Sequence, residues 1–131
     1  MANPNIVSVS SIYAGNAAWA LTTTLDATLF TAAADVTVKI NSITATNTHA
    51  STVTNLTLDI DGITNGTHDG VALTSGATTI KIAAALPVPG SDVLNVIDRP
   101  IYLMENDILR GGASAASCLE LFASFEVIND A

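Results

Sequence analysis

The segment from Cys118 to Val127 alternates with a period of two, and this pattern constrains the fold more than any other feature. Its apolar side would be formed by Leu119, Leu121, Ala123, Phe125 and Val127. A strand of an antiparallel sheet that buries one face has this pattern. No helical period extends over more than about ten residues anywhere in the chain. The sequence therefore predicts a protein built from strands.

Two further runs predict long strands. In residues 36–45 the apolar phase shifts by one residue near Asn41 and Ser42, which predicts a β-bulge or bend there. Residues 53–60 form the second run, after the polar loop 47–51. Their closeness in sequence predicts that the two runs pair as a hairpin, the long central pair of the fold.

Shorter strands are predicted on both sides of this pair. A strand starting at residue 78 should end at the proline-containing segment 87–91, because proline cannot donate to a sheet ladder. Residues 105–107 predict a tight turn, residues 61–70 an exposed loop, and residues 26–34 a helical turn. Further strands are predicted at 93–97, 101–104 and 108–110. Roughly eight or nine short strands imply an all-β fold, an antiparallel β-sandwich or jelly roll.

Composition agrees with this fold class. The 131 residues suit one domain, 1–131, in which residues 1–15 would form an interface strand or arm. Only 12% of residues are charged, about half the usual share, whereas the chain has 17 Thr. Threonine is β-branched and favours strands. An apolar share of 49% allows a sizeable core and argues against disorder.

Charge and cysteine content exclude several functions. Twelve acidic and four basic residues give a net charge of −8, which disfavours nucleic acid and a polybasic contact with a membrane. Cys118 is the only cysteine, so no disulfide forms within the chain. No basic residue precedes Lys39, and we expect no signal peptide and folding in a reducing cytoplasm.

Motifs for metal binding are weak. Asp59 and Asp61 precede a glycine as in a calcium loop, with Asn65 and Asp69 nearby, but the EF-hand order is not met. An ordinary Asp-rich strand end is the alternative. The two histidines, His49 and His68, lie in separate polar loops and have no zinc-ligand spacing. We therefore expect no metal and no cofactor, and leave calcium near Asp59 and Asp61 open.

Motifs for catalysis are absent from the sequence. There is no Gly-x-Ser-x-Gly elbow, and no histidine lies near Cys118 in sequence, so a structural cysteine is expected. Hydrolysis by a pair of carboxylates would need two acids at a fixed separation. The acids considered for such a pair are candidates only because they are acids: Glu105, Asp107, Glu120 and Glu126. We expect the protein not to be an enzyme.

Surplus apolar residues predict an interface between subunits. The N-terminal run has apolar residues on both faces, and the C-terminal strand has apolar residues on its polar side. Large exposed apolar patches usually mark an interface, and the alternative is that both strands are buried in a two-sheet core. The candidate interface residues are Ile6, Val7, Val9, Ile12, Tyr13, Phe122 and Ile128.

Residues 36–128 resemble small virion proteins of tailed bacteriophages. Residues 39–43 (Lys-Ile-Asn-Ser-Ile), Asn47 and residues 53–60 resemble their central hairpin. Residues 101–109 resemble their strand, acidic turn and strand, although these proteins more often have glycine where Asn106 stands. A small-residue loop at 111–117 and the closing strand to Val127 complete the resemblance.

The resemblance implies a structural protein of the virion, assembled in the cytoplasm of the host bacterium. Within that class we expect a capsid decoration, or cement, protein that binds the outer shell. The implied partners are the major capsid protein, or another virion protein, and further copies of this chain, with a trimer favoured. A neck, tail or fibre-base component is the first alternative. A host- or carbohydrate-binding module is the second, and it requires Trp19 or Tyr102 exposed in a cleft.

Overall fold

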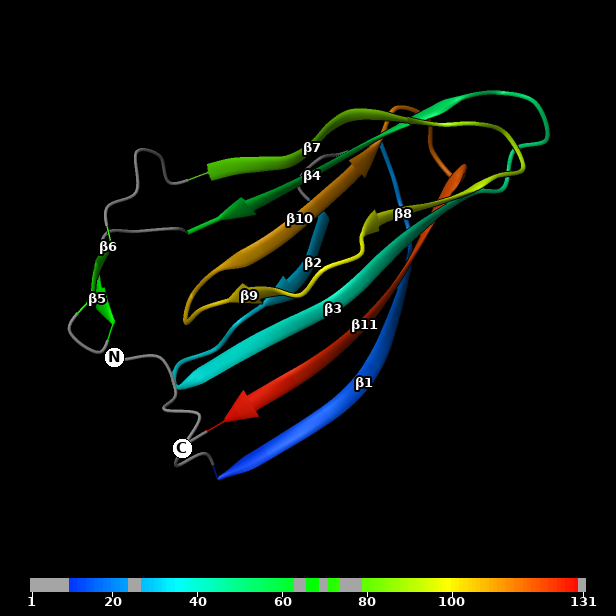
Figure 1. The fold of residues 1–131 in the computed structure, drawn as a ribbon. Helices are drawn as coiled ribbons and strands as arrows, with labels where there is room; N and C mark the ends of the chain where they lie inside the picture. The colour runs from blue at the N-terminus through cyan, green and yellow to red at the C-terminus, as the bar shows by residue number, and fades with distance from the viewer. Residues whose placement is uncertain (1–9, 24–26, 63–65, 69–70, 74–78, 130–131) are drawn as a thin grey trace.

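Strands that alternate apolar and polar residues must bury one face, and this chain does so by packing two antiparallel sheets against each other (Figure 1). The structure is a computed structural model that describes residues 10–23, 27–62, 66–68, 71–73 and 79–129. All its regular elements are strands, which confirms the predicted all-β sandwich. Over these residues there is no helix long and apolar enough to cross a lipid bilayer.

The larger sheet has five strands. Its path runs from β1 (Ser11–Ala20) through β11 (Leu119–Asn129) to β3 (Val36–Asn47). On the far side of β3 lie two short strands one after the other, β8 (Val93–Ile97) and β9 (Ile101–Leu103). The C-terminal strand that the sequence marked most clearly is thus an interior strand of this sheet.

The smaller sheet has four strands. Their order is β2 (Ala27–Thr31), β10 (Ile108–Ala113), β4 (Thr54–Asp61) and β7 (Thr79–Val88). A separate two-stranded ribbon joins β5 (Gly66–His68) to β6 (Val71–Leu73) between β4 and β7.

Aliphatic side chains from both sheets fill the space between them. The largest that are fully buried are Leu21, Ile40, Ile43, Leu56, Leu58, Leu103, Leu109, Leu119 and Leu121. Each full burial of such a side chain contributes about 1.5–3 kcal/mol of hydrophobic free energy. This packing is the main force that holds the two sheets together.

Three aromatic rings close the sandwich beside β1. The rings of Trp19 and Phe30 meet edge to face with centroids 5.1 Å apart, and those of Phe30 and Phe125 with centroids 5.0 Å apart. These contacts join strands of opposite sheets. Gly15 makes room for the Phe125 ring, since a Cβ at this position would lie 3.1 Å from its Cζ atom.

The predicted bulge in β3 is confirmed. Ile40 pairs with Phe125 and Ser42 with Ser124, so Asn41 is an extra residue between two consecutive partners on β11. The predicted turn at residues 105–107 is confirmed as well. Asn106 has a φ of 70°, and the Asp107 carboxylate accepts a hydrogen bond of 3.0 Å from the N–H of Met104.

The predicted hairpin between residues 36–45 and 53–60 is wrong. The first run, in β3, pairs with β11, β8 and β9, whereas the second, in β4, belongs to the other sheet and pairs with β10 and β7. The connection between them crosses from one sheet to the other instead of turning back within one.

Asn47, which is 1% exposed, stabilises this connection between β3 and β4 through its side-chain hydrogen bonds. Its Nδ2 donates hydrogen bonds of 2.8 Å to the carbonyls of Thr52 and Val88, and its Oδ1 accepts one of 2.9 Å from the N–H of His49. The side chain therefore ties the crossover loop to the end of β7, forty-one residues from Asn47 in sequence. Local periodicity contains no sign of this contact.

Two other expectations need correction. Residues 27–31, expected to belong to a helical turn, form strand β2, which pairs with β10 and packs Leu29 and Phe30 against the core. The strand expected to end before Pro87 continues to Val88. Pro87 is tolerated because β7 is an edge strand, where one side of the backbone needs no partner.

Replacing Asn47 tests the role of the crossover. Asn47→Ala removes three hydrogen bonds and leaves two carbonyls without their donor, so we expect a loss of about 2–4 kcal/mol in the free energy of unfolding. Urea denaturation measures this loss. The matched control, Asn95→Ala on an exposed position of β8, should change stability little. Equal stability of the two variants would contradict the assigned role.

Candidate functional site

The outer face of the five-stranded sheet has no second layer over it among the described strands. Strand registers place on it the side chains that alternate with those of the core. Small and uncharged residues predominate. The face comprises Ile12, Ala14, Asn16, Ala18, Ala20, Thr37, Lys39, Ser42, Thr44, Thr46, Val93, Asn95, Tyr102, Glu120, Phe122, Ser124, Glu126 and Ile128.

Four large apolar side chains are exposed on this face. Ile12 is 58% exposed and Phe122 50%, on the neighbouring strands β1 and β11. Val93 is 57% exposed and Tyr102 54%, on the short strands beyond β3. Single exposed apolar residues are ordinary, and these four stand at separate places on the face. Together with the small uncharged side chains between them, they make this face the candidate surface for a partner.

The candidate interface residues fall into three groups. Ile12, Tyr13 and Phe122 are exposed, as an interface requires, and Tyr13 is 66% exposed. Ile128 is only 6% exposed, so its assignment to an exposed surface is wrong. It stands on an interior strand between Ile12 and the buried Thr37, whereas Phe122 has the smaller Ala18 and Thr44 beside it. Ile6, Val7 and Val9 lie outside the described residues.

A shallow hollow of about 360 Å³ lies over the C-terminal end of β1. Its lining is contributed by β1, by the facing part of β11 and by Thr46 of β3, with Ala18, Ala20, Glu120 and Phe122 on the outer face. The two alanines leave space beside the larger Phe122 side chain. The hollow is open to solvent and mainly apolar, which suits a protruding side chain of a partner.

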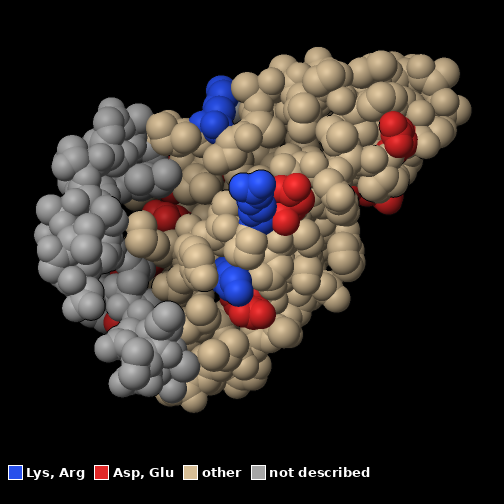
Figure 2. Space-filling model, in the orientation of Figure 1, with Lys and Arg blue, Asp and Glu red and all other residues tan. Residues whose placement is uncertain are grey.

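Charge is sparse on the outer face. Its only basic side chain among the described residues, Lys39, lies 3.9 Å from the Glu126 carboxylate. Among the described residues drawn in Figure 2, in the orientation of Figure 1, the blue and red groups are few and scattered. A surface of this kind can be covered by a protein partner without a large desolvation cost.

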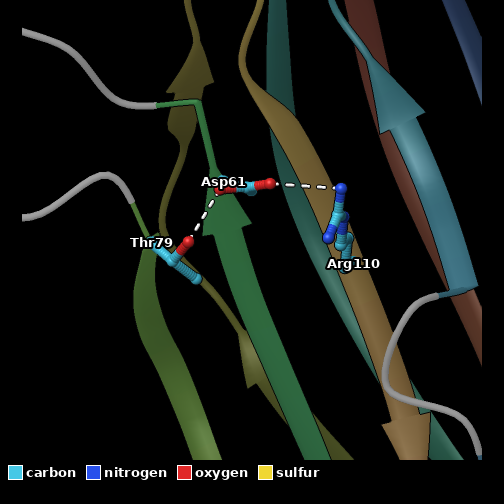
Figure 3. A network of polar contacts seen from close by, with 3 residues as sticks. All are labelled: Asp61, Thr79 and Arg110. Atoms are coloured by element: carbon cyan, nitrogen blue, oxygen red, sulfur yellow. Dashed lines mark hydrogen bonds and ion pairs between the residues drawn. The ribbon is translucent and has the colours of Figure 1, made fainter.

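Charged residues gather instead on the outer side of the four-stranded sheet. Asp61 Oδ2 lies 3.1 Å from Arg110 Nη2, and Thr79 donates a hydrogen bond of 2.7 Å to Asp61 Oδ1 (Figure 3). Asp59 is 4% exposed and pairs in register with Lys81 and Arg110. Its Oδ1 has no hydrogen-bond partner.

These contacts bear on the calcium hypothesis. Both carboxylate oxygens of Asp61 are engaged by Thr79 and Arg110. Within the described ranges no three His, Cys, Asp or Glu side chains stand close enough to hold a metal ion. Asn65 and Asp69, which the hypothesis also involved, lie outside the described residues.

The remaining candidate side chains have structural contacts. His49 Nδ1 accepts hydrogen bonds from the N–H groups of Ser51 and Thr52, at 3.3 and 3.1 Å, and so shapes the crossover loop. Cys118 is half-buried, and its Sγ donates to the carbonyl of Ala116 at 3.4 Å. Glu105 accepts a hydrogen bond of 3.1 Å from the N–H of Asp35. The side chain of His68 is outside the described part.

The aromatic residues considered for sugar binding lie apart. The Trp19 ring packs edge to face on Phe30, and Trp19 also contributes to the lining of the hollow. Tyr102 stands on the far side of β3, paired with Lys39. Trp19 is thus half-buried at the hollow, whereas Tyr102 is exposed but does not line it.

Sequence comparison adds no family. No protein-family model matches the chain, and no curated protein matches it significantly. The functional argument therefore depends on the surface itself.

Sequence reasoning missed Val93 and Tyr102 as members of the exposed face. Both stand on short strands whose sheet neighbours are decided by the three-dimensional pairing with β3. It also missed that β1 has only one strand neighbour among the described elements. A signal for this edge strand is present, since residues 10–23 contain no charged residue and no proline.

Acid titration tests the contacts of Asp61. Hydrogen bonds from Thr79 and from the N–H of Gly62, with the nearby charge of Arg110, lower the pKa of Asp61 below its ordinary 3.8, although burial opposes the shift. A lowered pKa in the folded state stabilises the protein above that ordinary value, and the contribution is lost as the pH falls below it. Asp61→Asn should therefore be less stable than the wild type at about pH 7, and this difference should shrink at an acidic pH below 3.8.

Denaturant midpoints at the two pH values measure the effect. Asp98→Asn is the matched control, because Asp98 is exposed on the connection between β8 and β9. It should leave stability nearly unchanged at both pH values. An undiminished difference between Asp61→Asn and the wild type in acid would contradict the linkage.

Proposed function

We propose that the protein is a structural component of a virion, a capsid decoration protein that binds the outer surface of a preformed shell. The observation that carries this proposal is the outer face of the five-stranded sheet, which has few charged side chains, no other described strand over it, and Ile12, Phe122, Val93 and Tyr102 exposed on it. The resemblance of residues 36–128 to small phage virion proteins supports the same class.

Adhesion would come from burial of this face against the shell. Apolar area removed from water contributes about 25 cal/mol per Å², and the small Ala, Ser and Thr side chains allow a close, flat approach. Each contact is modest, but a capsid repeats it by symmetry, so a decoration protein that contacts neighbouring shell subunits resists their separation. The proposal includes no catalytic step and no cofactor.

The proposed partners are the major capsid protein, or another virion protein, and further copies of this chain. The net charge of −8 favours a position away from packaged nucleic acid. Assembly would take place in the cytoplasm of the bacterial host. The alternative is a neck, tail or fibre-base component, which would bind its partners through the same face. Imaging of particles distinguishes this position from one on the outer shell.

Particles that lack the protein provide the first test. We expect imaging of intact particles with and without the protein to show density lost from the outer shell, and depleted shells to rupture at a lower temperature. Adding the purified protein back is the control and should restore the rupture temperature. Density lost from the neck or tail, with unchanged shell rupture, would contradict a decoration role.

A pair of variants tests the face itself. Phe122→Ser removes a half-exposed aromatic side chain from its middle, and truncation of an interface anchor costs about 2 kcal/mol or more, roughly thirtyfold in affinity. Val53→Ser removes an equally exposed apolar side chain from the loop before β4 and is the matched control. Binding to depleted particles, measured by cosedimentation, should weaken for Phe122→Ser alone. Equal binding of both variants would contradict the proposed face.

A further inference from the structure

One edge of the five-stranded sheet is formed by β1, whose only strand neighbour among the described elements is β11 (Figure 1). The N–H of Leu21, just after β1, donates to the carbonyl of Leu119 on the β11 side. Backbone groups alternate sides along a strand, so those of odd-numbered residues face β11. The groups of the even-numbered residues point to the open edge: Ile12, Ala14, Asn16, Ala18 and Ala20.

The other long edge strand is protected against pairing. β7 carries Lys81 and Pro87, and its register to β4 shifts twice, with Ala85 at a φ of 50°. Charges, proline and bulges are the usual means by which proteins block edge strands. β1 has ten residues with no charge, no proline and no register shift.

The remaining edges are short. β8 has five residues and β9 three, on the far side of the same sheet, and β2 has five residues with a register shift against β10. Short strands offer few consecutive hydrogen bonds to a new partner. Among the described strands, β1 is therefore the edge best suited to recruit another strand.

We propose that β1 pairs antiparallel with β1 of a second copy of this chain, around a twofold axis at Asn16. In this register Asn16 stands opposite Asn16 of the second copy, Ala14 opposite Ala18, and Ile12 opposite Ala20. All five residues with outward backbone groups are then in hydrogen-bonded pairs. The two five-stranded sheets become one continuous sheet.

Side-chain sizes along β1 suit this register. The middle of the strand is small, with Ala14, Gly15, Ala17 and Ala18, so two copies approach without a clash. Ile12, 58% exposed in one copy, comes beside Ala20 of the second, where the hollow lined by Ala18, Ala20 and Phe122 lies. The proposed contact thus covers an exposed apolar side chain and fills a vacant space.

The opposite side of the strand pair adds a second fit. The same register places Tyr13, which is 66% exposed, opposite Trp19 of the second copy in a pair without mutual hydrogen bonds. Side chains approach most closely in such pairs, and aromatic pairs across strands are favourable. Tyr13 is then covered by the Trp19 ring of the second copy. That ring is held in place by Phe30 of the same copy.

The distribution of charge also favours pairing of two copies through β1. Each copy carries −8, so two copies repel wherever acidic residues face each other. Residues 10–23 contain no charged residue, and β1 is therefore a part of the surface where two copies can approach with little repulsion.

A second copy fits this edge better than a ring of three. Rings formed edge to edge join two different edges head to tail, and the other described edges are short or protected. Twofold pairing needs only one suitable edge, because each copy contributes its own β1. The inference is argued from β1 and the hollow beside it, and it does not require the proposed role in the virion.

The test places a charge on the twofold axis. Asn16→Asp keeps the shape of the side chain but sets two carboxylates opposite each other in the dimer, so we expect the dimer dissociation constant to rise by about tenfold or more. Asn95→Asp makes the same change at an exposed position of the same face on β8 and is the matched control. Sedimentation equilibrium of the full chain should give twice the 13.4 kDa chain mass for the wild type and for Asn95→Asp.

Amide hydrogen exchange identifies the surface used. In the wild-type dimer the N–H groups of Ala14, Asn16 and Ala18 should be protected, and Asn16→Asp should remove this protection while Gly15 and Ala17 stay protected by β11. A monomeric or trimeric wild type, equal dissociation constants for the two variants, or a dimer with unprotected even-numbered amides would each overturn the proposal.

Discussion

Burial of one face of every long strand between two sheets is the constraint from which the other features of this protein follow. Aliphatic residues fill the interior, and the aromatic rings of Trp19, Phe30 and Phe125 close it beside β1. A two-layer architecture leaves much of the outward face of each sheet in contact with solvent. On the smaller sheet that face is charged, around Asp61 and Arg110. On the larger sheet it is nearly neutral, and there the proposed contacts are made.

Periodicity along the chain was sufficient to predict the fold class and much of the strand content. It located β8, β9, β10 and β11, the bulge at Asn41 and the turn at Asn106, because each is determined by neighbouring residues. Pairing between strands was not predictable in this way. An alternating pattern says which side of a strand is buried but not which strand lies beside it, and the hydrogen bonds of Asn47 join segments far apart in sequence.

The candidate surface was predictable only in part, because its membership also depends on which strands pair with each other. Ile12 and Tyr13 were candidates because the N-terminal run has apolar residues on both faces, and Phe122 because it lies on the polar side of its strand; all three are exposed, although burial in the core was the alternative. Position on a strand face did not decide exposure: Phe122 and Ile128 stand on the same face of β11, yet Phe122 is half-exposed and Ile128 is buried. Val93 and Tyr102 join the same face through pairing with β3, which no local pattern encodes.

The position of β11 has a consequence for biosynthesis. This strand lies between β1 and β3, yet it follows both by more than seventy residues along the chain. While a ribosome is still translating the middle of the sequence, neither β1 nor β3 has its main partner, and the larger sheet cannot close. Folding therefore waits for residue 119 and beyond to emerge, and the nascent chain must be kept from aggregating until then.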